Sequence, residues 1–244
     1  TEIQLKEAES GLNRAKKAKN TLLTQIEKAK VLEKVGRINE ALENFRLSIQ
    51  LSEPNSYIYF RIAKCYKKIN NKKLFLDYIK NSVREEPGNE KAWTYLIKYY
   101  LKNNNLRQSK YLASKALDNN HNSIKIIELN AIIHRDTGNI LEAIKFYNQI
   151  IEFKENLSWK IWKGLLKCLI DKKEWSELLR ISLRAKKHYP NKAFLDFTIS
   201  GCLLKNGKLN EAIYFYQSGK KTCQVPEKLI ESFPEFTENK TLLV

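Results

Sequence analysis

Residues 56–89 read SYIYFRIAKCYKKINNKKLFLDYIKNSVREEPGN, and residues 90–123, which follow directly, read EKAWTYLIKYYLKNNNLRQSKYLASKALDNNHNS. Each stretch contains a run of helix-forming residues, a short break at Asn70 or Asn104, and a second run of the same kind. Apolar residues recur in each run at intervals of three and four, which is the period of one face of an α-helix. Both stretches therefore predict a pair of helices joined by a tight turn.

Equivalent breaks recur at a nearly constant interval along the chain. They fall at Gly36, Asn70, Asn104, Gly138, Lys173 and Gly207, which are 34, 34, 34, 35 and 34 residues apart. A helix commonly ends with one residue in the left-handed region, which glycine and asparagine enter at little cost. We therefore expect each break to end one helix, and the chain to be an array of repeated helix pairs.

The second helix of each pair carries mostly small residues on one face. The residues five, nine and twelve positions after each break share that face, because a spacing of i, i+4 and i+7 matches the helical period. They are Ala41, Phe45, Ser48, Phe75, Ile79, Ser82, Ser109, Ala113, Ala116, Ala143, Tyr147, Ile150, Leu178, Ser182, Ala185, Ala212, Tyr216 and Gly219. Small side chains let a neighbouring helix approach closely, so this face is predicted to be buried.

The first helix of each pair shows an aromatic-x2-apolar-small-x2-large pattern, as in Tyr59, Ile62, Ala63 and Tyr66. Together with the pattern of the second helix it resembles the tetratricopeptide repeat family, whose signature is W-x2-L-G-x2-Y, then A-x3-F-x2-A and P. The resemblance implies an all-α fold, a right-handed α-α superhelix (TPR solenoid) of antiparallel helix pairs. Six repeats are expected at about 22–55, 56–89, 90–123, 124–158, 159–192 and 193–226.

The two ends of the chain fall outside these six repeats. Residues 1–21 resemble the second helix of a preceding repeat, with a boundary before the first helix of repeat one at residue 22. Residues 227–244 are expected to form a short capping helix and a tail or junction, since a terminal repeat needs a cover for its apolar side. The chain starts at Thr1, contains no Met and ends in an apolar Leu-Leu-Val. We expect it to be an excerpt of a longer protein.

Composition excludes several classes of protein. The chain has 244 residues, a formal charge of +17 and 43% hydrophobic residues, which is too apolar for a disordered basic tail. No apolar run approaches the ~20 residues that cross a bilayer. Four unpaired cysteines without a CxxC pair favour a reducing, cytoplasmic location. Lysine is so frequent overall that the positive charge alone does not establish a site for anions.

No motif for catalysis, a metal or a cofactor is found. Cys65, Cys168 and Cys202 share the tenth position of their repeats and are interpreted as core residues, because a buried thiol behaves as a small hydrophobe. The histidines are scattered, and the glycines 201 and 207 lack the spacing of a phosphate-binding loop. We therefore expect this segment to be no enzyme and to hold no metal or cofactor.

A ligand is expected on the surface formed by the first helices. Positions 2, 5, 9 and 12 of each repeat line the groove in the tetratricopeptide family, and this spacing places them on one helical face. The groove candidates in this chain are Lys30, Tyr57, Phe60, Lys64, Lys91, Lys98, Lys125, Lys160, Lys163 and Lys167. The groove is predicted to be basic along its middle, with aromatic residues toward both ends. A series of ammonium groups favours an extended anionic ligand through summed, salt-sensitive attraction.

Three functions agree with these patterns. The first is a non-catalytic scaffold for protein-protein interaction that binds a protein or an extended acidic peptide, which the resemblance implies. The second is a helical module of a larger enzyme, such as a bacterial surface-polysaccharide transferase, with an anionic glycan or other polyanion in the groove. The third is RNA binding, for which helical repeats need matched polar residues at fixed positions. The sequence does not decide the oligomeric state.

Overall fold

The computed structural model describes residues 2–51, 53, 55–153 and 156–238. Contacts divide the chain into two compact units, unit 1 (Thr1–Ile126) and unit 2 (Ile127–Val244). The described residues form helices and turns, with no strand among them, and none of their helices combines the length and apolarity that a bilayer span requires. The expected all-α architecture of repeated helix pairs is confirmed.

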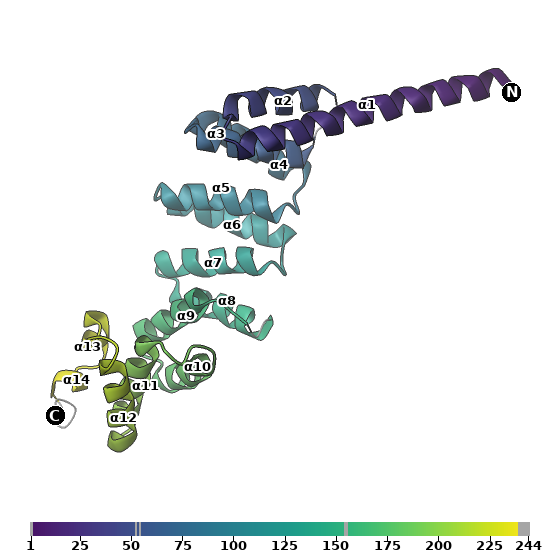
Figure 1. Ribbon diagram of the computed structural model, residues 1–244. Helices are drawn as coiled ribbons and strands as arrows, with labels where there is room; N and C mark the ends of the chain where they lie inside the picture. The colour runs from purple at the N-terminus through teal and green to yellow at the C-terminus, as the bar shows by residue number, and fades with distance from the viewer. Residues whose placement is uncertain (1, 52, 54, 154–155, 239–244) are drawn as a thin grey trace. The chain divides into compact units, whose positions relative to one another are not determined.

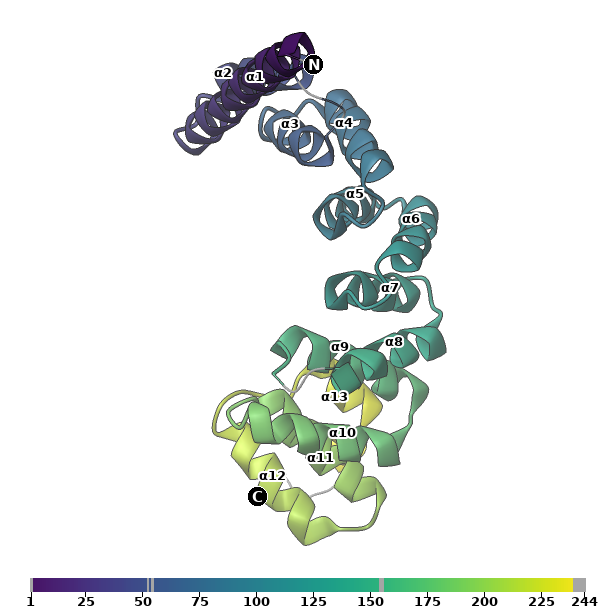
Figure 2. The same ribbon diagram turned by 90° about the vertical axis from the view of Figure 1, so that its right-hand side faces the viewer.

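Unit 1 contains three helix pairs and the start of a fourth (Figures 1 and 2). Its helices are α1 (Glu2–Lys34), α2 (Ile38–Gln50), α3 (Ser56–Lys68), α4 (Lys72–Glu85), α5 (Glu90–Lys102), α6 (Leu106–Asn119) and the first turn of α7 (Ile124–Asp136). Each first helix packs against the second helix of its own pair, as α3 does against α4 and α5 against α6.

Unit 2 contains the rest of α7 and the remaining pairs. They are α8 (Ile140–Phe153), α9 (Trp159–Lys172), α10 (Trp175–His188), α11 (Ala193–Lys205) and α12 (Leu209–Lys220), followed by the short helices α13 (Glu227–Ser232) and α14 (Glu235–Glu238). In this unit α14 packs beside α11. The last pair therefore has an additional segment next to its first helix.

All six predicted breaks adopt the left-handed conformation. The φ angles are +85° at Gly36, +58° at Asn70, +54° at Asn104, +79° at Gly138, +59° at Lys173 and +71° at Gly207. In every turn the amide of the following residue donates to the carbonyl five residues back, as Asn71 does to Tyr66 at 2.9 Å. This hydrogen bond satisfies a carbonyl that the ending helix leaves without a partner. The prediction of helix ends is confirmed, even at Lys173, where a lysine adopts the conformation.

The predicted packing face of the second helices is also confirmed. All eighteen residues at the three repeated positions are buried. One polar member of this face links two helices: the hydroxyl of Ser82 donates to the carbonyl of Ser56, and the hydroxyl of Ser56 donates to the carbonyl of Ser82, both at 2.9 Å. Small residues on this face therefore bring neighbouring helices together, as expected.

The first helix runs through the expected boundary at residue 22. α1 is continuous from Glu2 to Lys34. No glycine or proline interrupts residues 12–34. The hydroxyls of Thr21 and Thr24 donate to the carbonyls of Lys17 and Asn20 at 2.9 Å, so both side chains fit within the helix. The assignment of residues 1–21 to a preceding repeat, and of 22–226 and 227–244 to the array and its end, stays a prediction.

Beyond the last repeat, Pro226 precedes α13 and Pro234 separates α13 from α14. Phe233 and Phe236 are buried against the last repeat pair. The side chains of residues 1–9 and the apolar end at residues 242–244 lie outside the described residues, so the expectations that concern them are not addressed by the structure.

Candidate functional site

A hollow on the first helices of repeats two and three gathers several of the predicted groove residues in unit 1. Its volume is about 650 Å³. It is lined by Tyr57, Phe60, Arg61, Lys64, Glu86, Gly88, Asn89, Glu90, Lys91 and Tyr95. α3 contributes one wall and α5 the other, with the turn between α4 and α5 closing one end. We call this feature the first-helix hollow.

Aromatic rings form part of its lining. Phe60 and Tyr95 meet edge to face with ring centroids 5.3 Å apart, an arrangement that aromatic pairs favour. Phe60 is only 8% exposed, whereas Tyr57 is 40% exposed. The ammonium group of Lys67 lies 4.5 Å from the centroid of Tyr95. Tyr57 is therefore the predicted aromatic that an incoming ligand can contact most directly, while Phe60 mainly supports Tyr95.

One buried carboxylate, which no sequence motif marks, forms ion pairs with three cationic side chains of α3. Glu33 of α1 is 5% exposed and forms ion pairs with Arg61, with Lys68 at 3.1 Å and with Lys64 at 3.5 Å. Burial would raise the pKa of Glu33, but the hydrogen bond from Lys68 and the charges of Arg61 and Lys64 outweigh it and lower the pKa. Lys64 thus supports the contact between α1 and α3 as well as lining the hollow.

Other predicted lysines in unit 1 differ in whether they are paired. Lys30 contacts Glu27 at 2.6 Å and lies 5.5 Å from the ring centroid of Tyr57. Lys125 lies 3.2 Å from Glu90. Lys91 and Lys98 are exposed and form no ion pair with a carboxylate among the described residues. Among the groove residues predicted in unit 1, these two lysines are the ones whose charge an anionic ligand can neutralise.

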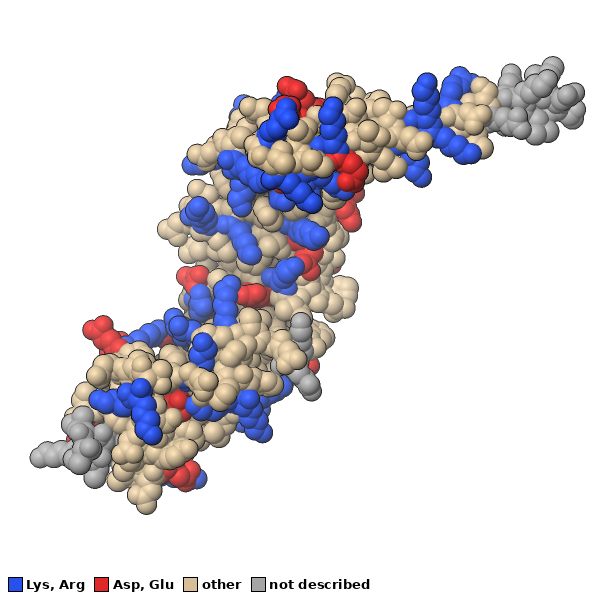
Figure 3. Space-filling view, viewed as in Figure 1, with Lys and Arg blue, Asp and Glu red and all other residues tan. Residues whose placement is uncertain are grey.

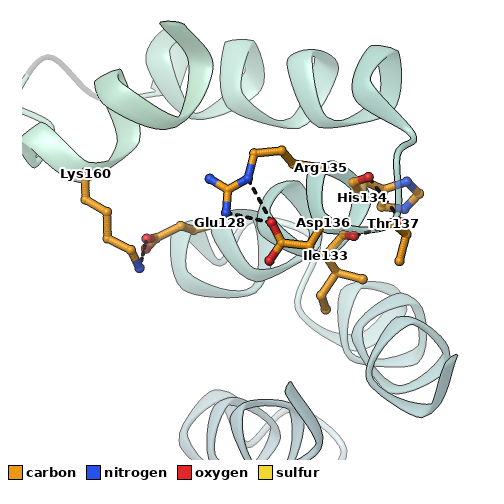
Figure 4. A network of polar contacts seen from close by, with 7 residues as sticks. All are labelled: Glu128, Ile133, His134, Arg135, Asp136, Thr137 and Lys160. Carbon is orange, nitrogen blue, oxygen red and sulfur yellow. Dashed lines mark hydrogen bonds and ion pairs between the residues drawn. The ribbon is translucent and has the colours of Figure 1, made fainter. Parts of the chain in front are cut away.

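The predicted lysines of unit 2 line α9. Lys160 reaches across to Glu128 of α7 at 2.8 Å (Figure 4). Lys163 lies 5.9 Å from the ring centroid of Phe194. Partial burial lowers the pKa of Lys167, and the nearby charges of Lys163, Lys228 and Arg135 lower it further. Of these three lysines only Lys160 forms an ion pair with a carboxylate among the described residues, so the positive charge on α9 is only partly compensated. Figure 3 shows Lys and Arg side chains on the visible face of both units.

The two aromatic residues at the groove positions of repeat six differ in exposure. Phe194 at position 2 is half-buried, whereas Phe197 at position 5 is fully buried and contacts Phe236 of α14 with ring centroids 6.5 Å apart. Gly201, at position 9, faces the ring of Phe233. The chain's own C-terminal segment therefore covers the part of α11 that was expected to face a ligand.

Three of the cysteines and one of the histidines contribute to the packing of the helices. Cys65, Cys168 and Cys202 are fully buried, and burial raises their thiol pKa values to about 11, 11 and 12. Such thiols are poor nucleophiles at neutral pH. His188 stacks on Trp162 at 5.9 Å. Among the described residues no three His, Cys, Asp or Glu side chains gather as a metal site requires.

The chain resembles solved structures more than it resembles known sequences. No family model matches it, and no curated protein matches it either. YrrB, described as a TPR protein with an unusual peptide-binding site, superposes with a TM-score of 0.60 at 14% identity, over 81% of this chain and 94% of YrrB. PilF of Pseudomonas aeruginosa superposes with a TM-score of 0.61 at 9% identity, over 91% of this chain and 99% of PilF. The C-terminal part of a TPR repeat-containing protein from Cytophaga hutchinsonii superposes with a TM-score of 0.61 at 19% identity, over 89% of this chain and 83% of that one.

Proposed function

We propose, from the tetratricopeptide-repeat fold of this chain, that it is a non-catalytic scaffold that binds an acidic segment of a partner protein on the surface of its first helices. The fold offers a series of equivalent helix faces, an arrangement suited to an extended ligand. One structural neighbour is described as having a peptide-binding site, which agrees with this proposal. A cytoplasmic location and the absence of catalysis are part of the same proposal.

The observation that carries the proposal is the first-helix hollow. It combines an exposed aromatic ring, Tyr57, with the exposed ammonium group of Lys91, and the exposed Lys98 lies two helical turns further along α5, outside the lining of the hollow. Aromatic rings supply contact area at low entropic cost, and ammonium groups attract carboxylates over distances of about 10 Å at moderate ionic strength. An extended peptide with carboxylate side chains matches both features.

Binding measurements on the intact chain test the proposal. The probes are a pool of labelled acidic peptides, an anionic oligosaccharide and a single-stranded RNA, each titrated at about 50 mM and about 300 mM salt. The peptide pool should bind most tightly and retain part of its affinity at the higher salt, because aromatic contacts are not screened. Tighter binding of the oligosaccharide or of the RNA would contradict the proposal and favour the polysaccharide or RNA-binding alternative.

A double variant identifies the surface involved. Lys91→Ser with Lys98→Ser should weaken the peptide affinity by about tenfold or more, since two charge-assisted contacts are lost. The matched control is Lys73→Ser with Lys110→Ser, which removes two exposed lysines from the second helices α4 and α6. Equal effects of the two double variants would show that overall charge, and not the first-helix surface, determines binding.

A further inference from the structure

The C-terminal segment of unit 2 shows how an acidic, aromatic peptide sits on this repeat. Phe233 is fully buried, and its ring centroid lies 5.0 Å from that of Trp175. The ammonium group of Lys205 lies 5.9 Å from the same ring and forms an ion pair with Glu235 at 2.5 Å. A Cβ at Gly201 would lie 2.5 Å from the ring, so only glycine leaves room for it.

These contacts can be assigned to positions of the repeat. Trp175 is at position 17 of repeat five, and Gly201 and Lys205 are at positions 9 and 13 of repeat six. Phe233 therefore lies beside the turn between α9 and α10 of repeat five and against the C-terminal end of α11 of repeat six. The residues at the same three positions of repeats two and three are Lys72, Lys98 and Lys102.

Unit 1 has a hollow lined by two of these three residues, Lys72 and Lys102, whereas Lys98 does not line it. Its volume is about 340 Å³, and it is lined by Lys67, Asn70, Asn71, Lys72, Phe75, Tyr99, Lys102 and Asn103. We call it the turn-end hollow. The rings of Phe75 and Tyr99 contact each other at a centroid distance of 5.2 Å and provide its apolar part. Lys98 carries a Cβ where Gly201 has none, so a ring bound in this hollow would lie on Tyr99 and not at the place that Phe233 takes beside Gly201.

The rim of the turn-end hollow is strongly basic. Lys67, Lys72 and Lys102 are all exposed, and none of them forms an ion pair with a carboxylate among the described residues. Partial burial lowers the pKa of Lys67, and the charges of Lys102 and Lys98 lower it further. A carboxylate placed among these lysines would relieve their mutual repulsion.

We propose that the turn-end hollow binds a partner peptide in which an aromatic residue is followed two positions later by a carboxylate, the spacing that Phe233 and Glu235 have on the last repeat. The aromatic side chain would pack on Tyr99, whose ring contacts the buried Phe75, and the carboxylate would pair with Lys102, the counterpart of Lys205. This inference rests on the proposed scaffold function and specifies the chemistry of the bound segment. The site lies at the turns of the repeats, apart from the first-helix hollow.

The C-terminal segment itself supplies the probe. Residues 227–238 read EKLIESFPEFTE, with four glutamates and one lysine. A labelled peptide with the sequence of residues 226–238 is titrated into the intact chain and followed by fluorescence anisotropy. A second peptide, in which alanine replaces the residue corresponding to Phe233, should bind about tenfold more weakly or worse, because a buried aromatic anchor is lost.

Two variants of the hollow give opposite expected results. Lys102→Glu should weaken binding of the peptide by at least about tenfold, because an attraction becomes a repulsion. Lys72→Trp places the counterpart of Trp175 beside the bound ring and should tighten binding by about 2- to 12-fold, although it removes a positive charge. Lys110→Glu, on the exposed face of α6, is the control for charge reversal and should change the affinity by less than about twofold.

Further variants separate the outcomes. Loss of binding in Lys205→Glu but not in Lys102→Glu would show that the peptide displaces the covering segment of unit 2, and this would overturn the inference. Loss in Lys91→Ser with Lys98→Ser, together with no response to Lys102→Glu and Lys72→Trp, would overturn the inference and leave the proposed function intact. No binding of any acidic peptide to the intact chain would contradict both.

Discussion

The ends of α5 in unit 1 and of α11 in unit 2 occupy the same positions of repeats three and six but have different surroundings. Lys98 and Lys102 of α5 are exposed to solvent. On α11 the counterpart of Lys98 is Gly201, which admits the ring of Phe233, and the counterpart of Lys102 is Lys205, which pairs with Glu235. The backbone of the repeat is the same in both, so a few side chains decide whether the place is open or covered.

Burial along the two helices follows from this difference. Nine consecutive residues of α11, 195–203, are buried, including Asp196, whose carboxylate pairs with Lys186 at 2.6 Å. α5 alternates between buried residues such as Leu96 and exposed ones such as Lys98. A helix that is apolar on all sides needs partners on all sides. α11 therefore depends on the C-terminal segment, whereas α5 is complete without a third partner.

Removal of the covering ring should have the largest effect. Phe233→Ala deletes a fully buried aromatic side chain, which typically lowers the free energy of unfolding by about 3–5 kcal/mol. Trp175 is in contact with Phe233, so the unfolding of unit 2 in urea can be followed by tryptophan fluorescence. The matched control is Phe153→Ala on the exposed end of α8. We expect this variant to change the free energy of unfolding by less than about 0.5 kcal/mol. Similar midpoints for the two variants would mean that α11 does not need its cover.

Local signals in the sequence predict the repeats well. Breaks at a nearly constant interval, five of them at glycine or asparagine and one at Lys173, predicted six left-handed turns, and the spacing of small residues predicted which face of each second helix is buried. Both features depend on residues within one or two helical turns of each other. The resemblance to tetratricopeptide repeats therefore extends to the fold, although no family model matches the sequence.

Contacts between distant residues could not be predicted in this way. The pairing of Glu33 with three cations joins residues about one repeat apart, and the position of Phe233 on Gly201 joins residues that no local pattern relates. One signal was nevertheless available. Gly201 occupies position 9, where four of the six repeats carry lysine, and a glycine inside a helix often marks the close approach of another group.

The next largest effect is expected from loss of the Glu33 carboxylate, which neutralises three cationic side chains within unit 1. Glu33→Gln leaves Arg61, Lys64 and Lys68 without their shared carboxylate, so the free energy of unfolding of unit 1 should fall by about 2–4 kcal/mol at neutral pH. Circular dichroism during urea unfolding measures it. Glu43→Gln on the exposed face of α2 is the control and should be close to neutral. A loss equal to that of the control would show that this carboxylate does not hold α1 to α3.

The same carboxylate gives a dependence on pH with a definite sign. Because the pKa of Glu33 is lower in the folded chain than in the unfolded one, its contribution is present above the unfolded value of about 4.3. It is lost as the pH falls through the folded value. The difference in stability between the wild type and Glu33→Gln should therefore shrink below about pH 4, as acid titrations of both chains can measure. A difference that stays constant down to about pH 2 would contradict the assignment.

The smallest effect tests why position 9 of repeat six is glycine. Alanine normally stabilises a helix relative to glycine by about 1 kcal/mol, and Gly11→Ala, where a Cβ meets nothing within 4 Å, should show a gain of about 0.5–1 kcal/mol. At Gly201 the added Cβ collides with the ring of Phe233, so we expect a net loss of about 1–2 kcal/mol. Combining Gly201→Ala with Phe233→Ala removes the collision, and the alanine at 201 should then stabilise α11. If Gly201→Ala destabilised the chain equally with and without Phe233, the glycine would be required by something other than the covering segment.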